Sequence, residues 1–363
     1  MQLSLRVTHR QWIQLILRGL IAVSVLSLLL SWRKTPRLLP QASPEVIHLN
    51  ISSRNVSSTG AERGTNSVFD ASGEGLCADN LFLLVYVHSS AQQFANRALL
   101  RSTWANSKNY DGLRMQVIFM LATPSNAIWT ENIQREAQIY KDIVIFPHFE
   151  TYKNISLKAS AAIQLVAKRC KHVPFVIKTD DDVLINMFSI IDFLTNRVDD
   201  FIGRDPSVPT NSSMHLRRLL LCNVWLKPVP FRNPKHKWYI SRQAYPDKYY
   251  PAFCSGLAWI MSSDVVVALS EAVRKTSQVF PFDDLWLTGI LAEQEGIIQS
   301  QMGHHCQFLQ KPETLSSDVL NKTVIFHGLD HNVFLYLWNS MITGVRPVLK
   351  PEKLTSTQRS NNS

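Results

Sequence analysis

The sequence predicts an α/β protein with a mostly parallel central sheet that is flanked by helices on both faces. Between residues 81 and 180, apolar runs of strand length alternate with segments of helical periodicity. The apolar runs are nearly continuous, as in strands that are buried on both faces of a parallel sheet. The chain has 363 residues, of which 45% are hydrophobic, so it can bury a sizeable core. Together these observations predict βαβ units.

Each expected element follows from its own residues. The expected strands are short, almost unbroken apolar segments at residues 81–89, 115–122, 142–146 and 175–180. The expected helices have apolar residues at helical spacing and lie at residues 91–104, 128–141, 155–170, 183–194 and 285–294. Ligands of such sheets bind beyond the carboxyl ends of the strands, so we expect a site after position 180.

The first 79 residues differ in composition from the rest. Residues 11–32 carry one charge, Arg18, and a helix of that length spans about 30 Å, the hydrocarbon core of a bilayer. We expect a transmembrane signal anchor there; a cleaved signal peptide is the alternative, but no small-residue cleavage site follows. The other expected divisions are a cytoplasmic tail at 1–10, a flexible luminal stem at 33–79, a folded domain at 80–345 and a C-terminal tail at 346–363.

Potential glycosylation sites favour a luminal position for everything after the anchor. Basic residues lie on both sides of it, so the positive-inside rule does not decide the orientation. All the N-x-S/T triplets lie downstream, and they begin at Asn50, Asn55, Asn154, Asn211, Asn321 and Asn361. We therefore expect a single-pass type II membrane protein.

Charge and cysteine content narrow the class further. The net charge of +10 suits anionic lipid or a phosphate-bearing substrate. Nucleic acid is not expected, because the chain has no zinc-finger spacing, no heptads after a basic region and no recognisable RNA-binding segment. None of the five cysteines forms a CxxC pair, so a structural zinc site is not expected. In an oxidising compartment two disulfides fit, with the pairs open, and we expect the loop at Cys306 to have a disulfide partner.

Three adjacent carboxylates, Asp180, Asp181 and Asp182, follow the last of the expected strands. They could cap the next helix through its free amides, but one aspartate is enough for a cap. A hard cation such as Mg²⁺ or Mn²⁺ prefers oxygen ligands and keeps positions open for substrate phosphates. If the strand continues, Asp180 and Asp182 point to one side and Asp181 points to the other. We therefore expect a metal and phosphate site here.

The segment KTDDDVLIN, residues 178–186, resembles the DxD-containing segment of the β-1,3-glycosyltransferases of family 31. That family includes β-1,3-galactosyltransferases and N-acetylglucosaminyltransferases. Other segments resemble its motifs in the same order: RALLRSTW at 97–104, FMLA at 119–122, the stretch 136–160, KWYIS at 237–241, YYPAFCSGLAWIMS at 249–262 and FPFDDLWLTGI at 280–290. The resemblance extends over about residues 80–340.

The resemblance implies a fold of the GT-A type and an inverting transfer from a UDP-sugar with Mn²⁺. It implies that Asp180 lies by the ribose and that Asp182 binds the metal, with His327 as a second ligand. For His327 the alternative is a hydrogen-bonded structural histidine. The resemblance also assigns nucleotide binding to Arg97 and Arg101. We further expect nucleotide-sugar binding by Lys158, Asp181, Gly256 and Trp259, of which Trp259 stands where the family usually has tyrosine. For the two arginines, one helical turn apart, the alternative is a surface face paired with a carboxylate.

Asp284 is the expected general base. Inversion requires one carboxylate to take the proton of an acceptor hydroxyl as that hydroxyl attacks the anomeric carbon. Asp284 matches the aspartate of the family's E-D-V motif, in which Asp283 stands where glutamate is usual. A like charge on Asp283 would raise the pKa of Asp284. Helix capping is the alternative for this pair and is compatible with catalysis. Trp238 and Trp259 are candidates for stacking against a sugar.

We therefore expect a Golgi membrane enzyme that moves a hexose, with galactose as first choice, from a UDP-sugar to a glycan on a glycoprotein or glycolipid. The alternative is an inactive relative that binds glycans or a partner enzyme, as a membrane-bound chaperone or lectin. A two-metal phosphohydrolase would need further Asp/His ligand motifs, and the sequence has none. The donor sugar, the acceptor and any association with itself or with other transferases stay open.

Overall fold

The computed structural model describes residues 76–106, 109–110, 112–151, 154–197, 218–302, 306–308 and 323–344. The expected cytoplasmic tail, anchor, nearly all of the stem and the C-terminal tail lie outside these ranges. So do all the expected glycosylation sites except Asn154, namely Asn50, Asn55, Asn211, Asn321 and Asn361. In the described ranges no helix combines the length and the hydropathy needed to cross a bilayer.

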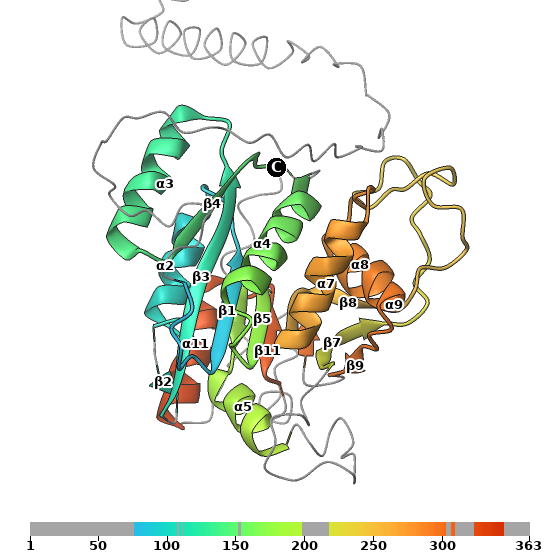
Figure 1. Cartoon of the computed structure of the whole chain (residues 1–363). Helices are drawn as coiled ribbons and strands as arrows, with labels where there is room; N and C mark the ends of the chain where they lie inside the picture. Colours follow the sequence, from blue (N-terminus) through green and yellow to red (C-terminus); the bar gives the residue numbers. More distant parts are fainter. Residues whose placement is uncertain are drawn as a thin grey trace, which may run out of the picture. The chain divides into compact units, whose positions relative to one another are not determined.

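A mixed sheet forms the centre of the described chain (Figure 1). Its order is β2-β3-β1-β5-β8-β7-β9, and β4 also pairs with β3. Strands β1, β3, β4 and β5 are mutually parallel where they pair, whereas β8 is antiparallel to both β5 and β7. The bounds are β1 Leu83–His88, β2 Asn109–Tyr110, β3 Leu113–Thr123, β4 Ile143–Phe149, β5 Phe175–Asp180, β7 Leu220–Trp225, β8 Phe253–Ser262 and β9 Ser300–Gln301.

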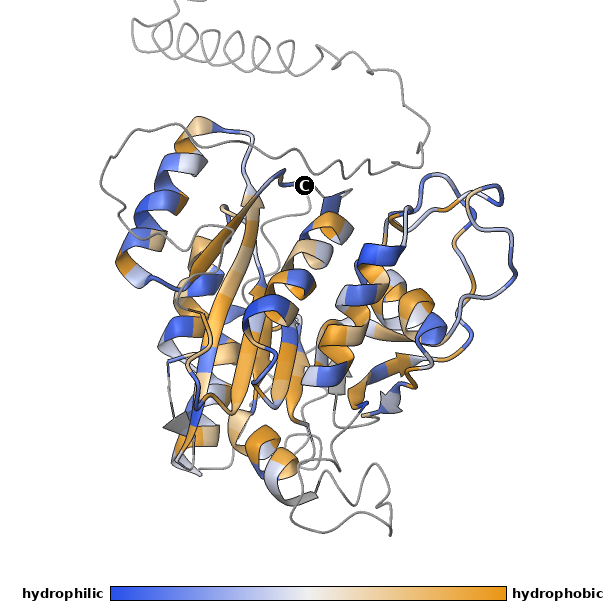
Figure 2. Ribbon diagram, viewed as in Figure 1, coloured by the Kyte–Doolittle hydropathy of each residue, from blue (hydrophilic) through white to orange (hydrophobic). Residues whose placement is uncertain are grey.

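Helices cover both faces of this sheet. One face packs against α2 (Phe94–Ser102), α3 (Ala127–Tyr140), α5 (Met187–Asp192) and α11 (His331–Thr343). The other packs against α4 (Ile155–Arg169), α7 (Ser263–Lys275) and the helix that begins at Asp283. Helices α4 and α7 lie side by side in front of the sheet in Figure 1. Figure 2 shows strands that are hydrophobic along their length and helices that turn polar residues outward.

The alternation of side chains along β1 shows why the sheet needs two cores. Leu83, Val85 and Val87 enter the core on one face, while Leu84 and Tyr86 enter the core on the other. All five side chains are fully buried. The predicted α/β class and the mostly parallel sheet between residues 83 and 180 are therefore confirmed, with each expected strand and helix of that region present.

The single helix expected at residues 183–194 is wrong. Val183–Ile185 form a short strand, β6, which pairs antiparallel with β11 (Ile325–His327) in a second sheet that also contains β10 (Cys306–Phe308). Two β-branched residues in three favour this strand. Helix α5 begins only at Met187, because the Asn186 side chain accepts the Ser189 N–H as a cap.

The helix expected at residues 285–294 is present but has an irregular middle. It begins as α8 at Asp283–Leu285, widens to π-helical turns at Trp286–Leu291 and ends as α9 at Ala292–Gln294. Turns of this kind are rare overall, but those that occur often lie at functional sites. The widened segment follows Asp283 and Asp284 directly, so it lies where the sequence predicts the catalytic base.

Two disulfides hold the ends of elements together. Cys77, which precedes β1, is bonded to Cys170 at the end of α4, and Cys222 of β7 is bonded to Cys254 of β8. The expectation of two disulfides is confirmed. Because these bonds use four of the five cysteines, the expected disulfide partner of Cys306 within the chain is wrong.

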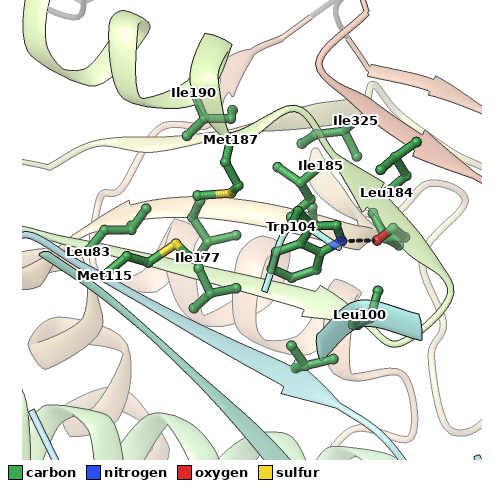
Figure 3. Close-up of a cluster of buried hydrophobic side chains, with 14 of the residues drawn as sticks. Leu83, Leu100, Trp104, Met115, Ile177, Leu184, Ile185, Met187, Ile190 and Ile325 are labelled. Carbon is green, nitrogen blue, oxygen red and sulfur yellow. Dashed lines mark hydrogen bonds between the residues drawn. The ribbon is translucent and has the colours of Figure 1, made fainter. Parts of the chain in front are cut away.

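Trp104 fastens the end of α2 to the strand that follows the three aspartates. Its indole is fully buried among apolar side chains that include Leu100 and Ile185 (Figure 3). The indole Nε1–H donates to the carbonyl of Val183 at 3.0 Å. Val183 comes immediately after Asp182, so this bond fixes the chain where it leaves the aspartate cluster.

We expect Trp104→Phe to lower the free energy of unfolding by about 1–3 kcal/mol, because the Val183 carbonyl would be left buried without its donor. Chemical denaturation of the purified full-length chain measures this. Trp225→Phe is the control, since that indole is 50% exposed and its loss should change stability by less than about 0.5 kcal/mol. Equal stability of the two variants would contradict the anchoring role.

Candidate active site

The expected site residues converge where β1 and β5 end and β8 begins. Asp180 is the last residue of β5 and its register partner in β1 is His88, the last residue of that strand. On the other side of β5, Thr179 pairs with Ala258 of β8, two residues after Gly256. The carboxyl ends of parallel strands are where α/β sheets bind ligands.

Lys178 is the cation at the centre of this region. Its Nζ lies 2.7 Å from Asp180 Oδ1 and 2.5 Å from the Gly256 carbonyl, and 4.9 Å from the centre of the Trp259 ring. The residue is only 1% exposed. Burial by itself lowers the pKa of Lys178, but Asp180 and Asp283 raise it above its ordinary value, so the amine is charged.

Lys178 is a functional residue that the sequence reasoning missed. The available signal is a lysine inside an apolar strand, two positions before Asp180 and hence on the same face. A buried lysine requires a partner of opposite charge. That rule, applied to FVIKTD, would have paired the two residues.

Asp284 lies against Gly256 at the start of the helix that follows β8 and α7. A Cβ built on Gly256 would lie 3.3 Å from Asp284 Oδ2, so glycine allows the carboxylate to approach the strand closely. Asp284 Oδ1 accepts the Leu285 N–H at 2.7 Å. Burial, followed by the charge of Asp283, raises the pKa of Asp284 to about 7, whereas Lys178 acts against this rise.

Asp283 lies deeper than its neighbour and faces β1. It is 7% exposed, and its Oδ2 is 3.8 Å from Nδ1 of His88. Burial and the charges of Lys178 and Lys158 hold the pKa of His88 well below its usual range, so the imidazole is neutral. Within the described ranges neither ring nitrogen of His88 has a hydrogen-bond partner. Neither aspartate is the N-cap, which is Phe282, so capping does not account for the pair.

Asp182 and His327 form the more exposed part of the site. The pairing of β6 with β11 sets Val183 opposite His327, and it brings Asp182 Oδ2 to 3.2 Å from His327 Nε2. Their side chains are 48% and 33% exposed. Burial raises the pKa of Asp182, but the hydrogen bond from His327 outweighs it and lowers the pKa; the same bond raises the pKa of His327.

These two side chains fit a divalent cation that is bound mainly through its substrate. Among the described residues, no group of three or more His, Cys, Asp or Glu side chains could hold a metal by itself. Asp182 and His327 supply one carboxylate and one imidazole, which suit Mn²⁺. Cations of this kind take further ligands from substrate phosphates and water.

Asp181 turns away from the other two aspartates. Its Oδ1 accepts the Asn96 Nδ2–H of α2 at 3.1 Å, and Asn96 Oδ1 is 3.0 Å from His331 Nε2 at the start of α11. Burial, opposed by hydrogen bonds from Ser89 and Asn96, raises the pKa of Asp181 to about 6. Because β5 ends at Asp180, strand alternation does not extend to Asp182, whose neighbour is His327.

The two arginines are engaged inside the protein. Arg97 is fully buried and donates to both oxygens of Glu136, at 2.8 and 2.6 Å. It also donates to Ser89 Oγ and to the carbonyls of Ser90 and Ala91. Arg101 donates to the carboxylates of Glu136 and Asp142. This differs from the expected nucleotide contact and instead matches the carboxylate-paired alternative, although Arg97 is buried and not on a surface.

Lys158 and Trp259 are also internal. Lys158 Nζ donates to the Ser89 carbonyl at 2.9 Å and to Glu150, so it supports the loop after β1 from the side of α4. Trp259 is fully buried and donates to the Ser255 carbonyl, so it packs beneath Lys178 and offers no face to a sugar. Trp238, in contrast, is 46% exposed.

Comparison with known proteins identifies the family of the chain. The family model described as Galactosyltransferase matches residues 95–303. Beta-1,3-galactosyltransferase 1 of Homo sapiens, and that of Mus musculus, is 30% identical over 269 residues, 73% of this chain and 76% of the relative. Beta-1,3-galactosyltransferase 5 of Homo sapiens is 28% identical over 260 residues, 72% of this chain and 78% of the relative.

Among solved structures, the apo structure of the WbbM bifunctional glycosyltransferase aligns with a TM-score of 0.38 at 9% identity. The alignment covers 72% of this chain and 50% of the other chain. The family model and the curated relatives together define a glycosyltransferase. The chain belongs to the galactosyltransferase family, so the resemblance carried by its motifs is confirmed.

We expect Arg97→Met to lower the free energy of unfolding by about 3–5 kcal/mol, because Glu136 would keep a buried charge with half of its pairing. Arg135→Met is the control: its pair with Glu131 is exposed, and removing it should cost about 0.5 kcal/mol or less. Chemical denaturation of the full-length variants checks both values. Unchanged stability combined with weaker UDP binding would return Arg97 to the nucleotide site.

Proposed function

We propose that the protein is an inverting, Mn²⁺-dependent β-1,3-hexosyltransferase with a GT-A fold. It moves a hexose, galactose as first choice, from a UDP-sugar to a hydroxyl of a glycan on a glycoprotein or glycolipid. The observation that carries this proposal is the half-buried Asp284 carboxylate, held against Gly256 beside the Lys178–Asp180 pair, with a pKa near the pH at which a base must work.

In the proposed reaction Asp284 takes the proton of the acceptor hydroxyl. The acceptor oxygen forms a bond to the anomeric carbon as the bond from that carbon to the diphosphate breaks, and UDP leaves. A single displacement of this kind inverts the configuration and needs no covalent intermediate. Asp283 supports the role, because its charge raises the affinity of Asp284 for a proton.

Asp182 and His327 are the residues that would hold Mn²⁺ in this proposal. The metal would neutralise the charge that develops on the departing diphosphate. Asp180 would lie by the ribose, oriented from below by Lys178. Different residues thus serve the two ends of the displacement. Asp182 and His327 serve the leaving group, and the Asp284 carboxylate serves the proton of the acceptor.

The acceptor would approach over the segment between β7 and β8. That segment exposes the aromatic side chains of Phe231, Trp238 and Tyr249, next to the exposed Trp225 at the end of β7, and apolar sugar faces stack on such rings. Its residues Tyr245 and Tyr250 pack with Leu285 and Phe282, which flank Asp283 and Asp284. Arg232 holds the segment together by donating to the carbonyls of Ile240, Ser241, Tyr245 and Asp247.

We place the enzyme in the Golgi membrane, with a single type II anchor at residues 11–32 and the catalytic domain in the lumen. Two disulfides support an oxidising compartment. Asn154 would be available there for glycosylation, although its Nδ2 donates to the Phe149 carbonyl at 3.0 Å in the folded chain.

We expect Asp284→Asn to reduce transfer by about 10²–10⁴-fold, because the amide cannot accept the proton, while UDP binding stays within about twofold. In the unmodified protein the base works as the carboxylate, so kcat should rise with pH and level off above about 7. Radiometric transfer from UDP-galactose and calorimetry with UDP measure these quantities. Asp79→Asn, at an exposed site, is the control. Loss of UDP binding along with transfer would move Asp284 to the nucleotide site.

We expect Asp182→Asn to weaken Mn²⁺-dependent UDP binding by at least about tenfold and to abolish transfer, because the cation would lose its carboxylate. His327→Gln should act in the same direction. Calorimetry with UDP in the presence and absence of Mn²⁺ separates metal binding from turnover. If UDP binds equally well without the metal, the metal assignment is wrong. If UDP binds with Mn²⁺ but no UDP-sugar is turned over on any acceptor, the chain is a binding protein.

A further inference from the structure

The helix that carries Asp284 is fastened to the start of β8 by a threonine hydroxyl. Thr288 is fully buried. Its Oγ1 accepts the backbone N–H of Cys254 at 2.9 Å and donates to the carbonyl of Asp284 at 2.6 Å. One hydroxyl therefore joins a fixed point of the sheet to the backbone of the proposed base.

The sheet is irregular beside the Cys254 amide that makes this bond. The register between β7 and β8 shifts between Cys222 and Val224, whose partners are Trp259 and Cys254. Bulges of this type are frequent next to active sites. The disulfide from Cys222 to Cys254 holds the two strands together at this irregularity, so the donor amide has a defined position.

Gln299 adds a second connection between the same two segments. Its Nε2 donates to the carbonyl of Thr288 and, at 3.0 Å, to the carbonyl of Ala252. Ala252 lies just before β8, so the side chain spans the same gap as the Thr288 hydroxyl.

Two glycines make the approach of helix and strand close enough for these bonds. A Cβ built on Gly289 would lie 2.9 Å from Phe253 Cβ and 3.3 Å from the Ala252 carbonyl oxygen, distances that a real side chain could not keep. Gly256 admits the Asp284 carboxylate in the same way, as described above. Backbone contacts this close leave little freedom for the helix to shift relative to β8.

The bond of this hydroxyl also lies within the irregular part of the helix. A threonine that bonds to the carbonyl four residues earlier competes with the regular amide and often bends the helix. Thr288 makes this bond inside the π-helical turns at Trp286–Leu291. The widened turns are thus tied at their centre to the sheet and at their start to Asp284.

We infer that Thr288 is a positioning residue through which β8 and its disulfide set the place of the Asp284 carboxylate beside Gly256 and Lys178. The inference rests on the proposed role of Asp284 as the base. Thr288 itself is too buried to touch a substrate, so it acts through Asp284. A shift of about 1 Å in a reacting group can cost about 10²-fold in rate, and a looser helix would allow such a shift.

The test compares Thr288→Val, which keeps the shape and removes the hydroxyl, with Thr288→Ser, which keeps the hydroxyl. Thr130→Val is the matched control, because Thr130 Oγ1 bonds to the Asn126 carbonyl four residues earlier on the exposed side of α3. In the full-length chain we expect Thr288→Val to lower kcat by at least about tenfold, with KM for UDP-galactose and Kd for UDP within about twofold. Thr288→Ser should recover kcat to within about threefold, and Thr130→Val should not change it.

Hydrogen exchange followed by mass spectrometry tests the connection without relying on activity. In Thr288→Val, peptides that contain Cys254 and residues 283–291 should exchange at least about tenfold faster than in the unmodified chain and in Thr130→Val. Either of two results overturns the inference: unchanged exchange in Thr288→Val, or unchanged kcat in Thr288→Val when Asp284→Asn is inactive. If Asp284→Asn still transfers the sugar, the proposed function is wrong instead. The positioning role of Thr288 is then wrong too, because it depends on Asp284 as the base.

Discussion

The ion pair between Lys178 and Asp180 is the interaction on which the site depends. Lys178 is buried, and it can remain charged there because it is shared between the Asp180 carboxylate and the Gly256 carbonyl. Since Asp180 ends β5 and Gly256 lies near the start of β8, this one ammonium group ties the parallel half of the sheet to the antiparallel half. Without this ammonium group, the carboxylates of Asp180 and Asp283 and the carbonyl of Gly256 would have no cation between them.

Burial and neighbouring charges also give the carboxylates around Lys178 different pKa values. Burial and then the charge of Asp283 raise the pKa of Asp284 to about 7, although the nearby Lys178 cation acts against this rise. Asp182 instead stays more exposed and meets His327, which lowers its pKa. In the proposed function the same residue type therefore serves as a proton acceptor in one place and as a metal ligand in the other. Burial and neighbours decide the difference.

Sequence reasoning found β1, β3, β4 and β5, their order along the chain and the aspartates after β5, because apolar runs and acidic clusters are local signals; it missed the two-residue strand β2. It missed the strand Val183–Ile185, whose partner β11 lies about 140 residues further along the chain. It also predicted contacts of Trp259 with a sugar and of Arg97 with a nucleotide, and residue type alone does not reveal that both side chains are fully buried. Partners distant in sequence decided each of these cases.

The contacts of the motif RALLRSTW, residues 97–104, show what such a family motif does in the folded chain. Arg97 and Arg101 meet Glu136 and Asp142, and Trp104 holds the Val183 carbonyl, so all three fix the backbone around the aspartates from within. A motif of this kind reports how the carboxylates are held and carries no information about the sugar that reaches them. In the proposed function the acceptor is selected by the exposed segment between β7 and β8, where Trp238 lies beside Phe231. Family membership therefore follows from the buried motifs, whereas specificity has to be sought in that segment.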